Sequence, residues 1–153
     1  MKIENRFTVA APMEQVWVAL ADPARVGPCI PGCEAVERIA EMSYKAALKS
    51  QLGALKVRFN LLVEVLEETP PSELIARVSG EEGTHASVLR ADTTVRLSAV
   101  DANQTAVVFA AEVSIVGRFG KFGLGVMKKQ AERVGQSFGD AFRREVEAAG
   151  RVL

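Results

Sequence analysis

The side chains best suited to acid–base chemistry follow one another closely in one stretch of this chain. His85 is the only histidine, and its ring can transfer protons near neutral pH. Arg90, Asp92, Thr94 and Arg96 come next at a spacing of two, which places them on one face of a strand. If His85 and either Arg90 or Asp92 pointed into one pocket, they would suit an enzyme of the cyclase or dehydratase kind. The alternative, which the alternation favours, is a ladder of ion pairs on the solvent side of a sheet.

Two cysteines, Cys29 and Cys33, have a spacing that would suit half of a zinc site. The chain has no second cysteine pair and one histidine, so the other metal ligands are missing. The sequence therefore predicts that both are packing residues in a reducing compartment. The glycines of residues 117–125 do not form a phosphate loop, and no serine lies in a nucleophile elbow. We expect no catalytic residue, no metal and no cofactor.

Composition limits the class of protein further. The 153 residues suffice to bury the core of one domain, which we place at residues 1–150. The 19 basic residues equal the 19 acidic ones, and this balance argues against a nucleic-acid partner. The N-terminus lacks an apolar segment of signal-peptide length, and no stretch approaches about 18 uninterrupted apolar residues. We therefore expect a cytoplasmic protein.

The elements that must position these side chains are mostly strands. Apolar and polar residues alternate at residues 3–10, 34–41, 43–52, 55–68, 72–81, 84–100 and 104–116. Short turns separate the last six, which is typical of a meander of hairpins. After the first strand, Pro12 and Asp22-Pro23 mark one or two short helices. The order predicts an α+β fold in which a curled, seven-stranded antiparallel sheet wraps around a long C-terminal helix.

The C-terminal helix begins near Phe122. Its apolar face has the helical period and consists of Met127, Ala131, Val134, Phe138, Phe142 and Val146. Gly135 and Gly139 lie beside this face, although each glycine costs a helix roughly 1 kcal/mol relative to alanine. Two explanations stay open: the glycines permit close contact between helix and sheet, or they leave a cavity there.

Strand parity predicts where such a cavity would open. The turns at residues 52–54 and 81–83, the stretch 117–123 and the stretch 29–33 fall at one end of the sheet. The apolar residues of this rim are Ile30, Pro31, Leu52, Leu55, Phe119 and Phe122. Apolar side chains on glycine-rich loops suit the mouth of a binding site. The alternative is that these loops fold over the end of the core.

An apolar ligand between sheet and helix would contact residues from all of these elements. The predicted contacts are Trp17, Ile30, Leu52, Phe59, Leu61, Phe109, Phe119, Phe122, Met127, Ala131, Val134, Gly135 and Phe138. We expect Phe119→Asp or Phe122→Asp to weaken ligand retention and leave the fold intact. Phe138→Asp, on the helix stripe, is expected to unfold the protein.

The order of elements resembles the START-like helix-grip superfamily, and the chain is more narrowly similar to the carbon monoxide dehydrogenase CoxG family. The quoted likeness comprises residues 7–12 (Phe-Thr-Val-Ala-Ala-Pro), Val16-Trp17, Leu20, Asp22-Pro23, residues 29–34 (Cys-Ile-Pro-Gly-Cys-Glu), Tyr44, Gly53, Arg58-Phe59, Glu112-Val113 and residues 117–123. The Pro-Gly-Cys-Glu piece is the most specific part. Many members carry a long C-terminal extension with a membrane-anchoring end, whereas this chain stops at Leu153.

The resemblance implies an accessory protein of a molybdenum hydroxylase of the carbon monoxide dehydrogenase type, and it brings no catalytic residues. It favours a lipophilic redox carrier, such as a quinone, as the apolar ligand. It also implies transient contact of the apolar rim with a membrane during loading. An adaptor that assembles the hydroxylase, with an incidental cavity, is the alternative within the same family.

Overall fold

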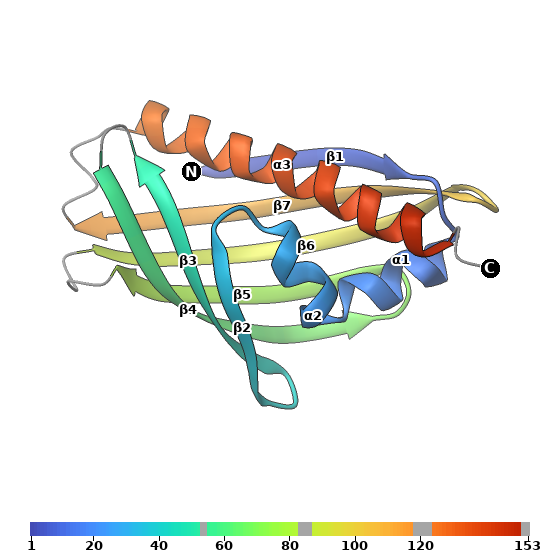
Figure 1. Ribbon diagram of the computed structural model, residues 1–153, viewed down its shortest axis with the longest axis horizontal. Coiled ribbons are helices and arrows are strands. Elements are labelled where there is room, and N and C mark those ends of the chain that lie inside the picture. The colour runs from blue at the N-terminus through green and yellow to red at the C-terminus, as the bar shows by residue number, and fades with distance from the viewer. Residues whose placement is uncertain (53–54, 83–86, 118–123, 151–153) are drawn as a thin grey trace.

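The computed structural model describes residues 1–52, 55–82, 87–117 and 124–150 (Figure 1). The elements in chain order are β1 (Lys2–Val9), α1 (Met13–Leu20), α2 (Pro23–Val26), the short 3-10 helix η1 (Gly27–Cys29), β2 (Cys33–Ala40), β3 (Ser43–Leu52), β4 (Leu55–Thr69), β5 (Glu73–Glu82), β6 (Ser87–Asp101), β7 (Gln104–Gly117) and α3 (Leu124–Gly150). Every predicted strand is present among them, with ends that differ by at most three residues.

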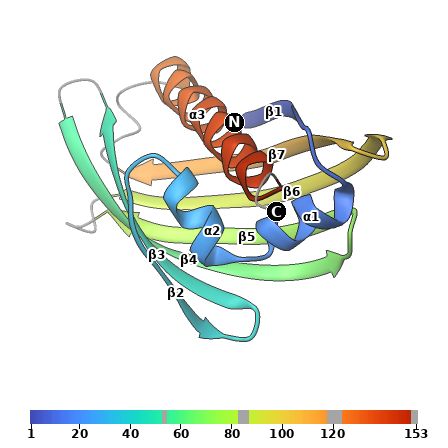
Figure 2. The ribbon, with the colours of Figure 1, turned by 45° about the vertical axis from the view of Figure 1, so that its right-hand side comes forward.

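The strands form one antiparallel sheet in the order β1-β7-β6-β5-β4-β3-β2. The last six strands are therefore a meander, and β1 returns to the edge beside β7. Figure 1 shows α3 lying along the concave side of this curled sheet, and the turned view of Figure 2 agrees. The predicted fold class, a sheet wrapped around a long C-terminal helix, is confirmed.

Local sequence explains the short helices that follow β1. Pro12 lies at the N-cap position of α1 in an extended conformation, so the helix begins at Met13. The Oδ1 atom of Asp22 accepts a hydrogen bond from the backbone N–H of Ala24 at 3.0 Å, and Pro23 occupies the first turn of α2. These two signals bring α1 and α2 back toward the sheet, where α1 covers one end of the concave face.

The largest packed region, here called the α1 cluster, lies where α1 and the C-terminal half of α3 meet the sheet. Its buried members are Val9, Ala11, Val16, Trp17, Ala19, Cys29, Val95, Leu97, Val107, Phe142 and Val146. Phe142 is fully buried, and its ring lies edge-on to Phe7 and stacks on Phe138. The hydroxyl of Thr105, also buried, donates to the carbonyl oxygen of Ala11 at 2.8 Å. This cluster closes one end of the fold.

Helix α3 meets β1 along a seam of two glycines. A Cβ atom added to Gly139 would lie 3.0 Å from the Phe7 ring, and one added to Gly135 would lie 3.1 Å from the Asn5 amide nitrogen. Both distances are shorter than an ordinary van der Waals contact. Of the two explanations open for these glycines, close contact between helix and sheet is therefore the one that the structure supports.

Candidate functional site

The packing of side chains on the concave face of the sheet changes along its length. At the end opposite α1, a second cluster, here called the rim cluster, contains buried Val57 and Phe59 with Leu61, Leu89 and Ile115 packed around them. Strand register places two rows of residues between the rim cluster and the α1 cluster. One row runs Val63, Val78, Ala91, Val113, and the next includes Ala76 and Ala111, which flank the buried Thr93. We call the six apolar residues of these two rows the floor.

The floor consists of small side chains, and some of its surface stays accessible beneath α3. The three alanines are buried, whereas Val63, Val78 and Val113 are half-buried although they face the concave side. Ala131 and Val134, on the apolar face of α3, are half-buried as well. Because cores normally pack to crystal-like density, apolar residues left half-buried between two packed clusters indicate that side chains fill this part of the concave side less completely.

The two flanks of α3 are held differently. On the β1 side, the glycine seam brings the helix against Asn5 and Phe7. On the opposite side, the Nε2 atom of Gln130 donates to the hydroxyl of Ser50 on β3 at 3.2 Å. The helix is thus packed against one flank of the sheet and hydrogen-bonded to the other, with the floor between them.

Two polar residues lie on the concave face beside the rim cluster. Glu82 is 3% exposed and Ser87 is 1% exposed, and their positions follow the register pair Glu81 and Val88 of β5 and β6. The sequence analysis did not select either residue. The alternation Leu74, Ala76, Val78, Gly80, Glu82 was the available signal, since it places Glu82 on the same face as the apolar residues.

The predicted ion-pair ladder is confirmed on the opposite, convex face. Arg77 Nε lies 3.2 Å from Asp92 Oδ1, and Arg96 Nε lies 2.9 Å from Glu73 Oε2, each across a direct strand pair. Arg90 is exposed on the same face. Arg90 and Asp92 therefore do not point toward the floor, and the acid–base set loses two of its three members. His85, the third, lies outside the described residues.

Both cysteines are free, and no group of three metal-ligating side chains occurs in the described ranges. Cys29 belongs to the α1 cluster, and its Sγ atom donates to the carbonyl oxygen of Arg25 at 3.3 Å. Burial raises the pKa of the Cys29 thiol above its ordinary value, and the nearby Glu145 raises it further. Burial also raises the pKa of Cys33. The thiols are thus held in their protonated form, as packing residues require.

This raised pKa makes stability depend on pH. Above about pH 8.5 the thiol of the unfolded chain ionises, whereas the folded protein keeps Cys29 protonated. We therefore expect the free energy of unfolding to fall as the pH rises through this range, and to fall less steeply in Cys29→Ala. Urea denaturation of both proteins between pH 7 and pH 10 measures the difference. If the free energy of unfolding changed equally with pH in both proteins, the Cys29 thiol would contribute nothing to this pH dependence.

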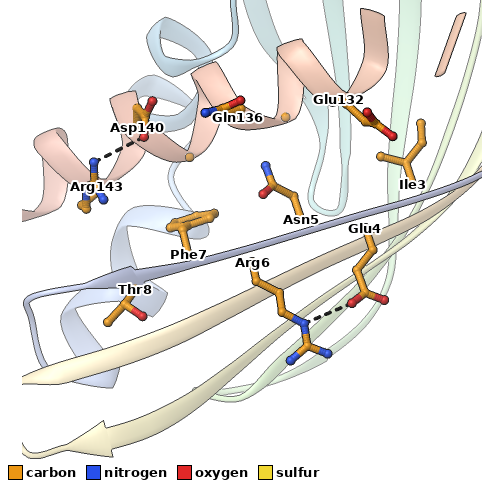
Figure 3. A pocket seen from close by; sticks show the side chains of 12 residues that line it. Ile3, Glu4, Asn5, Arg6, Phe7, Thr8, Glu132, Gln136, Asp140 and Arg143 are labelled. Atoms are coloured by element: carbon orange, nitrogen blue, oxygen red, sulfur yellow. Dashed lines mark hydrogen bonds and ion pairs between the residues drawn. The ribbon is translucent and has the colours of Figure 1, made fainter. Parts of the chain in front are cut away.

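A separate groove of about 570 Å³ runs along the outer side of the β1–α3 seam (Figure 3). Charged and polar side chains line most of it, including Glu4, Arg6, Glu132, Asp140 and Arg143. In Figure 3, Arg6 and Glu4 pair with each other on β1, and Arg143 pairs with Asp140 on α3. Its charged lining differs from the floor, and an apolar molecule would gain little there.

The structure brings most of the predicted ligand contacts that it describes toward the floor. Phe59 and Leu61 lie at its rim side, Phe109 lies on the concave face toward the α1 cluster, and Ala131 and Val134 lie on α3. Two more predicted contacts, buried Met127 and half-buried Phe138, lie on the apolar face of α3, and half-buried Ile30 follows η1.

Two of the predicted contacts stand apart, and three others lie wholly or partly outside the described residues. Trp17 is buried within the α1 cluster, and Gly135 faces β1. Leu52 ends β3, but its side chain lies outside the described residues, as do Phe119 and Phe122 altogether. The rim mutations at Phe119 and Phe122 therefore stay predictions.

Comparison with known proteins identifies the family. The family model for CoxG of carbon monoxide dehydrogenase matches residues 6–147. The chain belongs to the carbon monoxide dehydrogenase CoxG family. No sequence among curated proteins matches it.

Solved structures of other proteins have the same fold as this family member. A conserved protein from Geobacillus kaustophilus has a TM-score of 0.90 at 23% identity, with 97% of each chain covered. The Zhui aromatase/cyclase from Streptomyces sp. R1128 has a TM-score of 0.75 at 19% identity, covering 99% of this chain and 96% of that one. A START superfamily protein from Mycobacterium smegmatis has a TM-score of 0.77 at 11% identity, covering 97% and 98%. These likenesses establish the START-like fold.

The described helices of this CoxG family member include none that is long and apolar enough to cross a membrane. Helix α3 has the length, but charged residues such as Lys128, Lys129 and Arg133 occupy its outer face. The apolar face of α3 packs inside the fold.

Proposed function

We propose that this protein is a non-enzymatic carrier of an apolar small molecule, which binds between the floor and α3. The observation that carries the proposal is the incomplete burial of apolar residues in the middle of the concave face. Val63, Val78 and Val113 are half-buried there, between the α1 cluster and the rim cluster. A ligand there would remove Val63, Val78, Val113 and the facing α3 residues from water.

Burial of apolar surface is sufficient to hold such a ligand. Each large apolar side chain removed from water contributes roughly 1.5–3 kcal/mol, and a few of them reach micromolar affinity. The absence of a lysine or arginine from the described concave positions of β3–β7 favours a neutral molecule. A lipophilic quinone fits this chemistry.

Family membership supports a role beside a redox enzyme. The family is named for carbon monoxide dehydrogenase, and we propose that this member serves a molybdenum hydroxylase of that type. In this role the protein would work in the cytoplasm and touch the membrane while it loads a lipophilic carrier. A pure assembly adaptor is the alternative, and it would function equally well with the ligand site blocked.

A variant with a large side chain opposite the floor tests the carrier function. Ala131→Trp places an indole over the floor, and we expect it to abolish retention of menaquinone-4 with little change in melting temperature. Ser137→Trp, on an exposed position of the same helix, is the matched control and should retain the quinone. Native mass spectrometry and solvent extraction measure the bound molecule. Equal retention by both variants would overturn the proposed site.

A further inference from the structure

A polar pair, Ser50 and Gln130, lies at the edge of the apolar interior. Ser50 is on the concave face of β3, since its register partner is the buried Val57 of the rim cluster. Gln130 is on α3, one turn from Met127 on one side and one turn from Val134 on the other. Both polar side chains are half-buried, and the amide of Gln130 donates to the hydroxyl of Ser50 at 3.2 Å.

This pair has hydrogen-bonding capacity that the protein does not use. A glutamine amide has two N–H donors and a carbonyl acceptor, and a serine hydroxyl has one donor. In the described part of the chain, the bond to Ser50 is the one that Gln130 makes. No fully buried side-chain nitrogen or oxygen there lacks a partner, so the unused groups of Gln130 remain accessible. Turning the amide over still leaves at least one free donor.

We propose that Ser50 and Gln130 bind the polar head of the carried molecule. The head is a neutral hydrogen-bond acceptor, such as a ketone or quinone carbonyl, and the apolar remainder lies over the floor. The pair is uncharged, and the described concave positions of β3–β7 include no lysine or arginine to balance a carboxylate or phosphate. This assignment rests on the proposed carrier function and adds the residues that bind the polar head of its ligand.

The position of Ser50 and Gln130 also predicts the orientation of the bound molecule. Ser50 and Gln130 lie at the rim end of the concave face, whereas the small side chains of the floor lie deeper, toward the α1 cluster. A molecule whose carbonyl binds at the rim therefore lies with its apolar end toward the α1 cluster. A hydrocarbon without a carbonyl has no such anchor, and its affinity depends on apolar burial alone.

Two probes and three variants test this assignment. Menaquinone-4 has carbonyl groups, and a naphthalene with the same prenyl tail lacks them. We expect Gln130→Leu and Ser50→Ala to weaken menaquinone-4 binding roughly 3–10-fold, the amount that one hydrogen bond contributes, and to leave the hydrocarbon's affinity unchanged or higher. Gln136→Leu, on the exposed flank of α3, is the matched control and should change neither affinity.

The possible outcomes separate the two proposals. Equal weakening of both probes in Gln130→Leu, or no weakening of menaquinone-4 in Gln130→Leu and Ser50→Ala, would overturn the head site and leave the carrier function standing. A wild-type protein that binds neither probe would overturn the carrier function, and the head site with it. Melting temperatures confirm that each variant is folded.

Discussion

Phe142→Asp is expected to unfold the protein at room temperature. Phe142 has no exposed surface, and its ring centroid lies 5.5 Å from that of Phe138 and 6.2 Å from that of Phe7. Removal of the ring alone, as in Phe142→Ala, costs about 3–5 kcal/mol, a large part of the stability of a small domain. An aspartate at this position adds the desolvation of an unpaired carboxylate. Circular dichroism and urea denaturation measure the result.

The loss of stability caused by an aspartate depends on its position along α3. Phe138→Asp, which the sequence analysis expects to unfold the protein, should cost less than Phe142→Asp, because Phe138 is half-buried. Val126→Asp is the matched control on the same helix, and its side chain is 47% exposed. We expect Val126→Asp to melt like the wild type. A cooperative, wild-type melting transition in Phe142→Asp would contradict the packing described here.

Gly139→Leu is expected to separate α3 from β1. A Cβ atom at this position meets the Phe7 ring at 3.0 Å, and a leucine adds three more carbon atoms to the same space. Overpacking of this kind costs about 1–3 kcal/mol, which exceeds the gain of roughly 1 kcal/mol from replacing a helical glycine. Thermal and urea denaturation measure the loss.

A second glycine of the same helix is the control for this substitution. A Cβ atom on Gly125 would have nothing within 4 Å, so Gly125→Leu gains helix propensity without a clash. We expect Gly125→Leu to equal or exceed the wild type in stability and Gly139→Leu to fall below it. If both variants gained stability, the seam would not depend on the absence of a side chain.

The fold was predictable because its signals are local. The alternation of Val57, Phe59 and Leu61 defines a strand face without knowledge of its neighbours, and short turns then determine which strands are adjacent. The ion pair of Arg77 with Asp92 follows from the same parity, once β5 and β6 are known to be neighbours.

Prediction of the candidate site would have required contacts between distant parts of the chain, which no local sequence pattern shows. Gly135 and Gly139 were compatible with a cavity or with close packing, and only the approach of β1 distinguishes the two. Gln130 has the helical spacing to Met127 and Val134, but its partner Ser50 is 80 residues away in the chain. The floor itself consists of two rows of residues from four strands, so its small side chains become neighbours only through the strand register.

The unequal attachment of α3 has a consequence for how a carrier releases its cargo. The helix is packed tightly on β1, while one hydrogen bond between described side chains joins it to β3. The C-terminal half of α3 is fixed as well, because Phe142 and Val146 are fully buried in the α1 cluster and Arg25 Nε on α2 lies 3.0 Å from Glu145 Oε1. An opening that preserves this packing would therefore bend only the N-terminal half of α3 away from β3, which breaks the Gln130–Ser50 bond and leaves the seven-stranded sheet unchanged. The energetic barrier to ligand exchange would then be set by that polar contact, by the burial of Met127 and by the ligand's own buried area.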